Sequence, residues 1–186
     1  MTKSSMKILT FGNIKSAKLI KSGLSAFVLI LLLIPTFSHA FKFGALNDVD
    51  RDLPIFEMQD LDKQVWTPKN FEGKLTVVNF WATWCAPCRE EMPSLNRAWE
   101  KIQVDGIAMV GINIGDKPAD IHRFLDEVPI DFTVLRATDP SALQQWGVKG
   151  LPTTLVVDQN GKIIKEFVGP AEWDQDELLD PIRALL

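Results

Sequence analysis

The sequence predicts a single α/β domain in which helices flank a mixed central sheet. Apolar, β-branched segments alternate with amphipathic helical patterns between Leu75 and Trp146. Two further strand patterns then meet at Gln159-Asn160-Gly161, and a helical pattern ends the chain. Strand–helix–strand alternation produces parallel strands, whereas an Asn-Gly turn is typical of an antiparallel hairpin. The sheet should therefore contain both kinds of pairing.

Residues 1–40 have the character of a secretory signal peptide. They contain five lysines and no Asp or Glu, followed by the apolar run Leu24–Pro35 and the ending Ser38-His39-Ala40. A basic region, a short apolar region and a small-residue ending are the three parts of such a signal. The apolar run is shorter than the roughly 20 residues needed to span a bilayer. We therefore expect cleavage after Ala40, with an uncleaved membrane anchor as the alternative.

Residues 41–186 suit one domain with its own hydrophobic core. All 24 acidic residues and 15 of the 20 basic residues lie in this part, which gives it a net charge of −9. The acidic residues are scattered, and an acidic domain without a basic cluster is a poor nucleic-acid binder. We expect a monomeric, exported protein that binds no nucleic acid and works in the periplasm or at the cell exterior.

The first elements of the exported part are short. Phe41–Asp52 is expected to be a polar, mobile lead-in, so that the domain proper spans 53–186. Leu53–Met58 and Gln64–Thr67 show strand character on either side of the acidic turn Asp60–Lys63. This pattern predicts an N-terminal β-hairpin.

The apolar run Leu75–Trp81 leads to the only two cysteines and predicts a central strand that is buried on both faces. A helix should follow, to about Val104. Glu91 borders the apolar stripe of this helix, and Pro93 should kink it. The stripe itself is formed by Cys88, Met92, Leu95, Trp99 and Ile102.

The rest of the chain continues the alternation. We expect further strands over Gly106–Ile114, Phe132–Leu135, Thr153–Asp158 and Lys162–Val168. We expect helices over Pro118–Val128, Asp139–Trp146 and Glu172–Leu185.

A Cys-x-x-Cys pair at a strand-to-helix junction indicates thiol–disulfide exchange. A structural staple is the less favoured interpretation, because so short a bridge removes little entropy from the unfolded chain. A metal site would need a third ligand, and His122, the only histidine in residues 41–186, lies on a separate predicted helix. We expect no metal and no cofactor beyond the redox-active Cys85–Cys88 pair.

The positions of the two cysteines suggest different roles. Cys85 precedes the predicted helix, where unpaired N–H groups and the helix dipole favour a thiolate that can attack a substrate disulfide. Cys88, deeper on the inner stripe, would then resolve the mixed disulfide. Glu91 is either a buried proton acceptor for Cys88 or a solvated carboxylate. Trp84 either packs in the core or lies exposed beside the thiols.

Three segments together resemble the thioredoxin superfamily. Phe80–Cys88 is similar to its active-site signature, Pro93 matches the proline five residues after the second cysteine, and Gly150–Thr154 resembles its cis-proline segment. The predicted N-terminal hairpin, the export signal and the inserted Pro118–Val128 helix narrow the resemblance to the exported TlpA/ResA-like branch. The resemblance covers about residues 50–186. It implies a thioredoxin-like sandwich with an N-terminal β-hairpin extension.

The resemblance also implies roles for single residues. Pro152, as a cis-proline, would place backbone opposite the cysteines, where an extended substrate could pair; an ordinary turn proline is the alternative. Thioredoxin carries a buried aspartate where this chain has Asn79, and ResA-like proteins carry a buried glutamate at the position of Glu91. Cytochrome-maturation thioredoxins often carry glutamate where this chain has Thr153. The candidate catalytic residues are Cys85, Cys88, Glu91 and Pro152, and the candidate substrate-binding residues are Trp84, Pro87, Leu151 and Thr153.

These features predict an exported thiol–disulfide oxidoreductase that reduces protein disulfides, the direction in which TlpA/ResA-like proteins mostly run. Such a protein implies a membrane electron donor and client proteins, including those of apocytochrome c or copper-site assembly. A disulfide oxidase or isomerase would use the same residues. A peroxiredoxin-like thiol peroxidase shares the fold and would have a threonine two residues before the attacking cysteine. Thr83 has this position relative to Cys85. A non-enzymatic metal-binding module is the remaining alternative.

Overall fold

The structure is a computed structural model, and it describes residues 44–186. The expected signal peptide over 1–40, and the alternative of an uncleaved anchor, lie outside the described residues. Within residues 44–186, no helix combines the length and the apolar character needed to cross a membrane.

Eight strands form one mixed sheet in the order β1-β8-β7-β4-β5-β6-β2-β3. The strands β4, β5 and β6 are parallel to one another, and the remaining neighbours pair antiparallel. This confirms the expected mixed sheet. The strands are β1 (Asn47–Asp52), β2 (Met58–Asp60), β3 (Val65–Trp66), β4 (Thr76–Trp81), β5 (Ala108–Ile114), β6 (Thr133–Ala137), β7 (Thr153–Val157) and β8 (Lys162–Val168).

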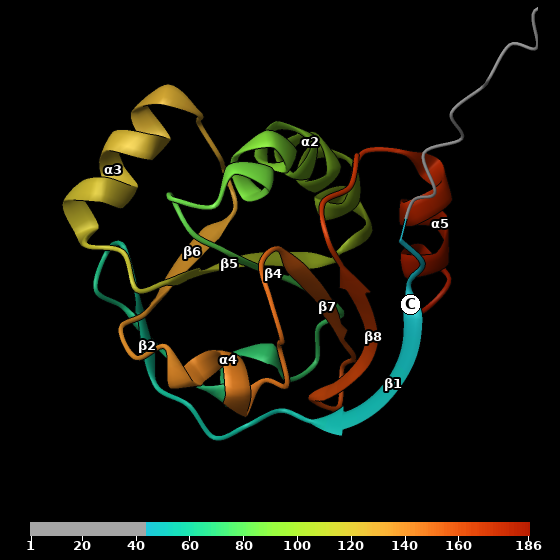
Figure 1. Cartoon of the computed structure of the whole chain (residues 1–186). Helices are drawn as coiled ribbons and strands as arrows, with labels where there is room; N and C mark the ends of the chain where they lie inside the picture. The colour runs from blue at the N-terminus through green and yellow to red at the C-terminus, as the bar shows by residue number, and fades with distance from the viewer. Residues whose placement is uncertain (1–43) are drawn as a thin grey trace, which may run out of the picture. The chain divides into compact units, whose positions relative to one another are not determined.

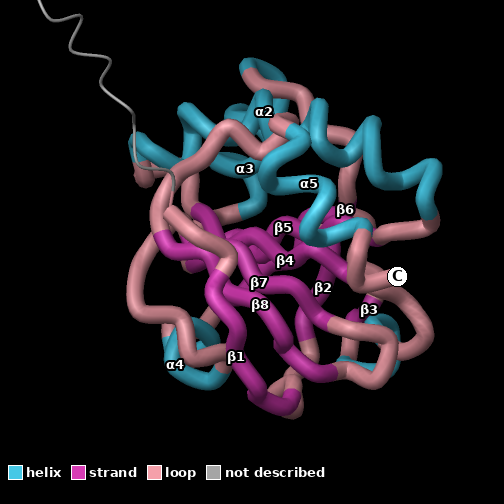
Figure 2. The backbone as a smooth tube through the Cα atoms, turned by 90° about the vertical axis from the view of Figure 1, so that its right-hand side faces the viewer, coloured by secondary structure: helices cyan, strands magenta, loops and turns pink. Residues whose placement is uncertain are grey.

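Helices cover both faces of the sheet, so the predicted thioredoxin-like sandwich is confirmed (Figures 1 and 2). One face carries α2 (Ala86–Ile102), α3 (Pro118–Glu127) and α5 (Asp176–Arg183). The opposite face carries α4 (Ser141–Gln145) and the 3-10 helix η2 (Pro68–Phe71), and a second 3-10 helix, η3 (Gln103–Asp105), extends α2.

The strand β4 lies at the centre of the sheet and is buried on both faces, as predicted. Val77 and Trp81 belong to the core beneath α2, whereas Val78 and Phe80 belong to the core on the α4 side. Since side chains alternate along a strand, Asn79 also points toward α2. The predicted apolar stripe of α2 faces this core: Cys88, Met92, Leu95 and Ile102 are fully buried and Trp99 is partly buried.

The prediction for Phe41–Asp52 is wrong in its second half, because Asn47–Asp52 forms the edge strand β1. The sequence of this segment has little strand propensity. Its order comes from antiparallel pairing with β8, supported by ion pairs of Lys162 with Asp50 (2.8 Å) and of Lys165 with Asp48 (2.6 Å). Tertiary pairing overrides local propensity in strands of this kind.

The N-terminal hairpin is confirmed, but its first strand begins at Met58 rather than at Leu53. Phe56 leaves the strand pattern to pack against Phe71 and Trp146, with ring centroids 5.8 and 5.2 Å apart. The hairpin extends the sheet through pairing of β2 with β6.

The last helix begins at Asp176, four residues later than the predicted Glu172. The preceding backbone is held by tertiary contacts, because the amide of Ala171 donates to Glu91 and the amide of Trp173 donates to the Ser94 hydroxyl. These N–H groups are directed into the core toward α2.

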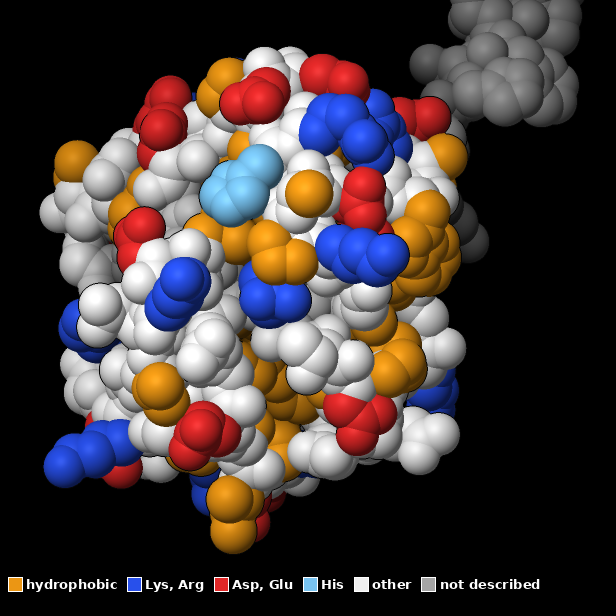
Figure 3. All heavy atoms as spheres, turned by 90° about the vertical axis from the view of Figure 1, so that its left-hand side faces the viewer, with side chains coloured by type: hydrophobic (Ala, Val, Ile, Leu, Met, Phe, Trp, Pro, Cys, Tyr) orange, Lys and Arg blue, Asp and Glu red, His pale blue; other side chains and the backbone are white. Residues whose placement is uncertain are grey.

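The surface carries both signs of charge. On the face shown in Figure 3, acidic and basic side chains are interspersed, with apolar side chains between them. This is the arrangement expected of a solvated surface.

Candidate active site

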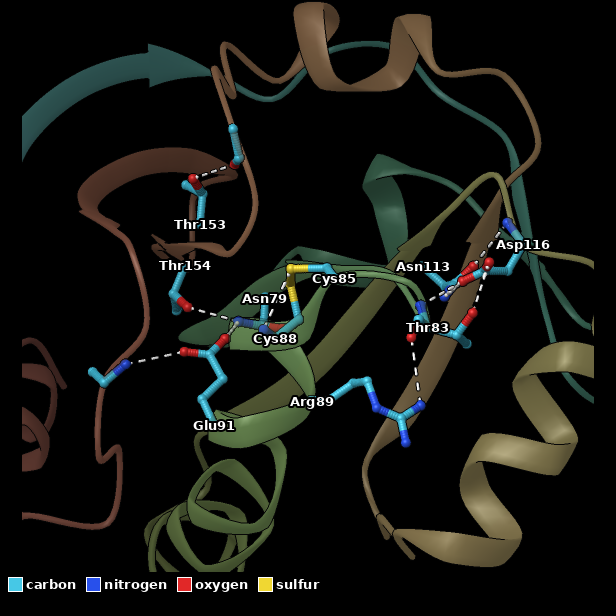
Figure 4. The surroundings of a disulfide bond; sticks show 12 residues. Asn79, Thr83, Cys85, Cys88, Arg89, Glu91, Asn113, Asp116, Thr153 and Thr154 are labelled. Carbon is cyan, nitrogen blue, oxygen red and sulfur yellow. Dashed lines mark hydrogen bonds between the residues drawn. A yellow bond between two sulfur atoms is a disulfide. The ribbon is translucent and has the colours of Figure 1, made fainter.

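The two cysteines form a disulfide at the N-terminus of α2, directly after β4 and a short turn (Figure 4). Cys85 is the N-cap residue, and its sulfur accepts a hydrogen bond from the amide of Cys88 at 3.3 Å. Cys85 is 6% exposed and Cys88 is fully buried. After reduction, the amide of Cys88 and the positive end of the helix dipole would stabilise a thiolate on Cys85. The geometry therefore provides an outer sulfur that can attack and an inner sulfur that can resolve.

A surface groove of about 660 Å³ adjoins the outer sulfur. The active-site turn, the end of β5, α4 and the segment before Pro152 meet around it, and its side chains carry no charge. Three of the predicted substrate-binding residues, Trp84, Pro87 and Leu151, are among those that line it, together with Cys85, Ile114, Gly115, Pro140, Leu143 and Gly150. Trp84 is 69% exposed, so it lies at the surface beside the disulfide and not in the core.

The peptide bond between Leu151 and Pro152 is cis, as the resemblance implied. Pro152 is buried and its carbonyl accepts from the amide of Gly169 at 3.0 Å. Thr153 does not line the groove: it is buried, and its hydroxyl donates to the carbonyl of Gly150 at 2.8 Å. Its side chain therefore braces the loop that carries Leu151.

Glu91 is buried, with 2% of its surface exposed, so it is not the solvated carboxylate of the alternative interpretation. It lies three residues after Cys88 on the inner face of α2, a spacing that makes the two side chains neighbours on the helix surface. Its Oε2 accepts hydrogen bonds from the amide of Ala171 (3.1 Å) and from Trp173 Nε1 (3.0 Å), and its Oε1 accepts one from Asn79 Nδ2 (2.9 Å).

Asn79 joins this carboxyl group to the sheet (Figure 4). Its Nδ2 also donates to the hydroxyl of Thr154 on the neighbouring strand at 2.9 Å. The strand position that carries an acid in thioredoxin is therefore a hydrogen-bond donor here, and the buried carboxyl group comes from the helix instead.

Burial raises the pKa of Glu91 from 4.5 to about 7, although its three hydrogen bonds act in the opposite direction. Removing a carboxylate from water disfavours its charged form, and here that cost exceeds the gain from the donors. The group therefore changes its protonation state near neutral pH.

The oxidised protein should lose stability as the pH rises from 4.5 to about 7. In this window the folded state keeps the Glu91 proton that the unfolded chain has released, so the stabilisation is complete below 4.5 and is lost above 7. The loss amounts to about 3 kcal/mol. Denaturant titrations of wild type and Glu91→Gln at pH 4.5 and pH 8 measure it, and an equal pH dependence in both proteins would contradict it.

A second set of contacts, on the other side of the disulfide, fixes the active-site turn (Figure 4). The carboxylate of Asp116 accepts from the amide of Thr83 (2.7 Å) and from its hydroxyl (2.9 Å), and it accepts from Asn113 Nδ2 (2.8 Å). Arg89 donates to the carbonyl of Thr83 at 3.4 Å and lies over the ring of Phe124 at 4.9 Å. These contacts position the backbone directly before Trp84 and Cys85.

The sequence interpretation missed these supporting residues. Asp116 and Asn113 follow the end of β5, and β4 and β5 are parallel, so their ends share one sheet edge with the cysteines. That placement was a usable signal. Trp173 and Ala171 lie 82 and 80 residues from Glu91 in the chain, and no local pattern links them to it.

His122 is exposed on α3. Among residues 44–186, no three His, Cys, Asp or Glu side chains are grouped so that they could hold a metal ion.

Residues 49–166 match the AhpC/TSA family. The chain is 29% identical over 147 residues to the thiol-disulfide oxidoreductase ResA of Geobacillus thermodenitrificans, covering 76% of this chain and 84% of ResA. It is 40% identical over 115 residues to the thiol:disulfide interchange protein HelX of Rhodobacter capsulatus, covering 61% of this chain and 63% of HelX. Among solved structures, a Chlorobium tepidum protein assigned as thiol:disulfide interchange protein DsbE has a TM-score of 0.67 and 31% identity, covering 76% of this chain and 99% of that one.

Proposed function

This chain belongs to the AhpC/TSA family, has the thioredoxin-like fold and is a thiol–disulfide oxidoreductase; from that premise we propose that it is exported and reduces disulfide bonds in client proteins. The observation that carries the proposal is the Cys85–Cys88 pair, with its outer sulfur beside an uncharged groove and its inner sulfur buried. The cysteine pair itself carries the two electrons, without a further cofactor.

The reaction proceeds by two exchanges. The Cys85 thiolate attacks one sulfur of the client disulfide, forms a mixed disulfide and releases the other client sulfur as a thiolate. Cys88 then loses its proton and attacks Cys85, which forms the Cys85–Cys88 disulfide and releases the second client thiolate. Two electrons pass from the dithiol to the client, and the client thiolates take up protons.

The groove would hold the client segment during this exchange. Trp84, Pro87 and Leu151 present apolar surface to it, and Thr153 braces the loop that carries Leu151. The backbone before Pro152 would pair with an extended client segment, so recognition would combine main-chain hydrogen bonds with apolar contacts.

Glu91 would accept the proton of Cys88 in the second exchange. It is buried on the same helix face as Cys88, and its pKa of about 7 allows it to take up a proton and release it near neutral pH.

We expect the reduction potential of the Cys85–Cys88 pair to lie nearer to about −270 mV than to about −120 mV, the range spanned by related dithiol proteins. A low potential makes the dithiol the stronger reductant, as the proposed direction requires. Equilibration with reduced and oxidised glutathione at defined ratios, followed by tryptophan fluorescence, measures the value. A potential near −120 mV would overturn the direction and favour an oxidase or isomerase.

The reducing direction requires an electron donor in the membrane that restores the dithiol. The export signal predicted in residues 1–40 would bring the protein to the periplasm or cell exterior, where protein disulfides form. Clients would be proteins whose cysteines must be reduced, such as apocytochrome c or proteins of copper-site assembly.

The structure gives less support to a thiol peroxidase. Thr83 has the position that such an enzyme would need, two residues before Cys85, but its hydroxyl donates to Asp116 at 2.9 Å. Turnover of hydrogen peroxide by the reduced protein is the assay that separates the two functions.

A further inference from the structure

The two oxygens of the buried Glu91 carboxyl group have chemically different partners. Oε2 faces the amide of Ala171 and the indole of Trp173, at 3.1 and 3.0 Å. A backbone amide and an indole N–H are donors only. Oε1 faces the side-chain amide of Asn79 at 2.9 Å, and that group contains a donor and an acceptor.

This difference decides which oxygen can carry a proton. A proton on Oε2 would face two donors and no acceptor. A proton on Oε1 faces Asn79, which can present its carbonyl oxygen after the amide group turns over about its Cβ–Cγ bond. In the arrangement seen here, Oδ1 of Asn79 is buried and has no hydrogen-bond partner among residues 44–186, so this oxygen is available for such a bond.

The neighbouring Thr154 suits both arrangements of the amide. Its hydroxyl accepts from Asn79 Nδ2 at 2.9 Å, and a hydroxyl can also donate. With Glu91 ionised, Asn79 donates to Glu91 and to Thr154. With Glu91 protonated and the amide turned over, Asn79 Oδ1 would accept from both. Each state contains two hydrogen bonds, so neither arrangement costs a bond relative to the other.

We propose that Asn79 is a positioning residue whose amide group turns over when Glu91 takes up a proton, and that the proton resides on Oε1. The inference rests on the proposed role of Glu91. In the second exchange, the proton leaves the Cys88 thiol for Oε1, the Cys88 sulfur attacks Cys85, and the client thiolate departs. Asn79 keeps the carboxyl group hydrogen-bonded on both sides of that transfer.

The hydrogen-bond network around Glu91 is built from uncharged groups. The hydrogen-bond partners of Glu91 from β4 and from the segment before α5 are uncharged, and within residues 44–186 no charged side chain shifts its pKa. The titratable group that faces it from α2 is Cys88, which does not titrate while the disulfide is intact. In the oxidised protein, the titration of Glu91 can therefore be measured without interference from titration of the cysteines.

Nuclear magnetic resonance on the full, oxidised chain tests the inference directly. The Glu91 carboxyl carbon gives the pKa, and the side-chain NH₂ of Asn79 gives the orientation of the amide through its nuclear Overhauser contacts with Thr154. We expect these contacts above the Glu91 pKa and their loss below it. Contacts that persist across the titration would overturn the proposal.

Two substitutions test whether Asn79 bonds to Glu91 in both protonation states or donates only to the ionised carboxylate. Trp173→Phe removes a donor to the carboxylate and should raise the Glu91 pKa by about one pH unit. Asn79→Leu removes a partner that serves both states and should raise it by less than half as much. A shift in Asn79→Leu as large as that in Trp173→Phe would show Asn79 to be a simple donor.

Ser94→Ala is the matched structural control. Ser94 is buried beside Glu91 and bonds to the backbone of Glu91, Ala171 and Trp173, but not to the carboxyl group. Ser94→Ala should leave the Glu91 pKa unchanged. A shifted Glu91 pKa in this variant would mean that the shifts in Trp173→Phe and Asn79→Leu come from loosening of the segment before α5. The oxidised protein has no free thiol and carries out no exchange. These pKa measurements are therefore independent of the kinetic test of Glu91 as proton acceptor.

Discussion

Replacing Cys85 with serine should abolish thiol–disulfide exchange, with a loss of about 10³-fold or more in the rate of client reduction. A hydroxyl at the N-cap of α2 cannot become a stable anion near neutral pH, and it cannot form a disulfide. The buried Cys88 has no path to a client sulfur, so it cannot substitute for Cys85. The rate of insulin disulfide reduction measures the effect.

Cys88→Ser should show the complementary behaviour. Cys85 would still attack, but the mixed disulfide would persist because no second sulfur can resolve it. Mass spectrometry of the trapped adduct then identifies the client. The Cys85→Ser/Cys88→Ser double variant is the control and should trap nothing. Adducts carried by Cys88 in the Cys85→Ser variant would reverse the assignment of the two roles.

Glu91→Gln should slow the resolution of the mixed disulfide by about 10²-fold. The amide fills the same space and can keep hydrogen bonds with Asn79 and Trp173, but it cannot accept a proton from Cys88. The rate of client thiol release, followed by rapid mixing between pH 5 and pH 9, should rise through about pH 7 in wild type, as Glu91 ionises, and lose that step in the variant.

Glu90→Gln is the matched control for this prediction. Glu90 precedes Glu91 on α2 but is exposed, so the same chemical change there should leave the rate and the pH profile as in wild type. An unchanged rate and profile in Glu91→Gln would remove Glu91 from the mechanism, while the pH dependence of its hydrogen bonds would remain a separate question.

Most of the architecture could be predicted because its signals are local. The apolar run Leu75–Trp81 is buried on both faces, and the stripe from Cys88 to Ile102 faces the core, as their spacing indicated. The hairpin between β7 and β8 forms at Gly161, whose φ of 78° suits glycine. In these elements the residue pattern and the tertiary environment favour the same structure.

Elements without local signals could not be predicted. The segment Asn47–Asp52 becomes a strand because β8 offers it an edge. Residues 172–175 stay outside the last helix because the amides of Ala171 and Trp173 donate to Glu91 and Ser94. Each of these contacts joins segments that are far apart in the chain.

The sequence alone determined the reactive pair. Two cysteines spaced as Cys85 and Cys88 at the start of a helix can form and break a disulfide with each other, and that spacing is visible in the sequence. It also placed Glu91 on the edge of the inner stripe. Only the tertiary structure decided that Glu91 is buried and that Asn79, Ala171 and Trp173 surround it. The pKa of a carboxyl group depends on the water and the donors around it, and those come from segments that the folded chain brings together.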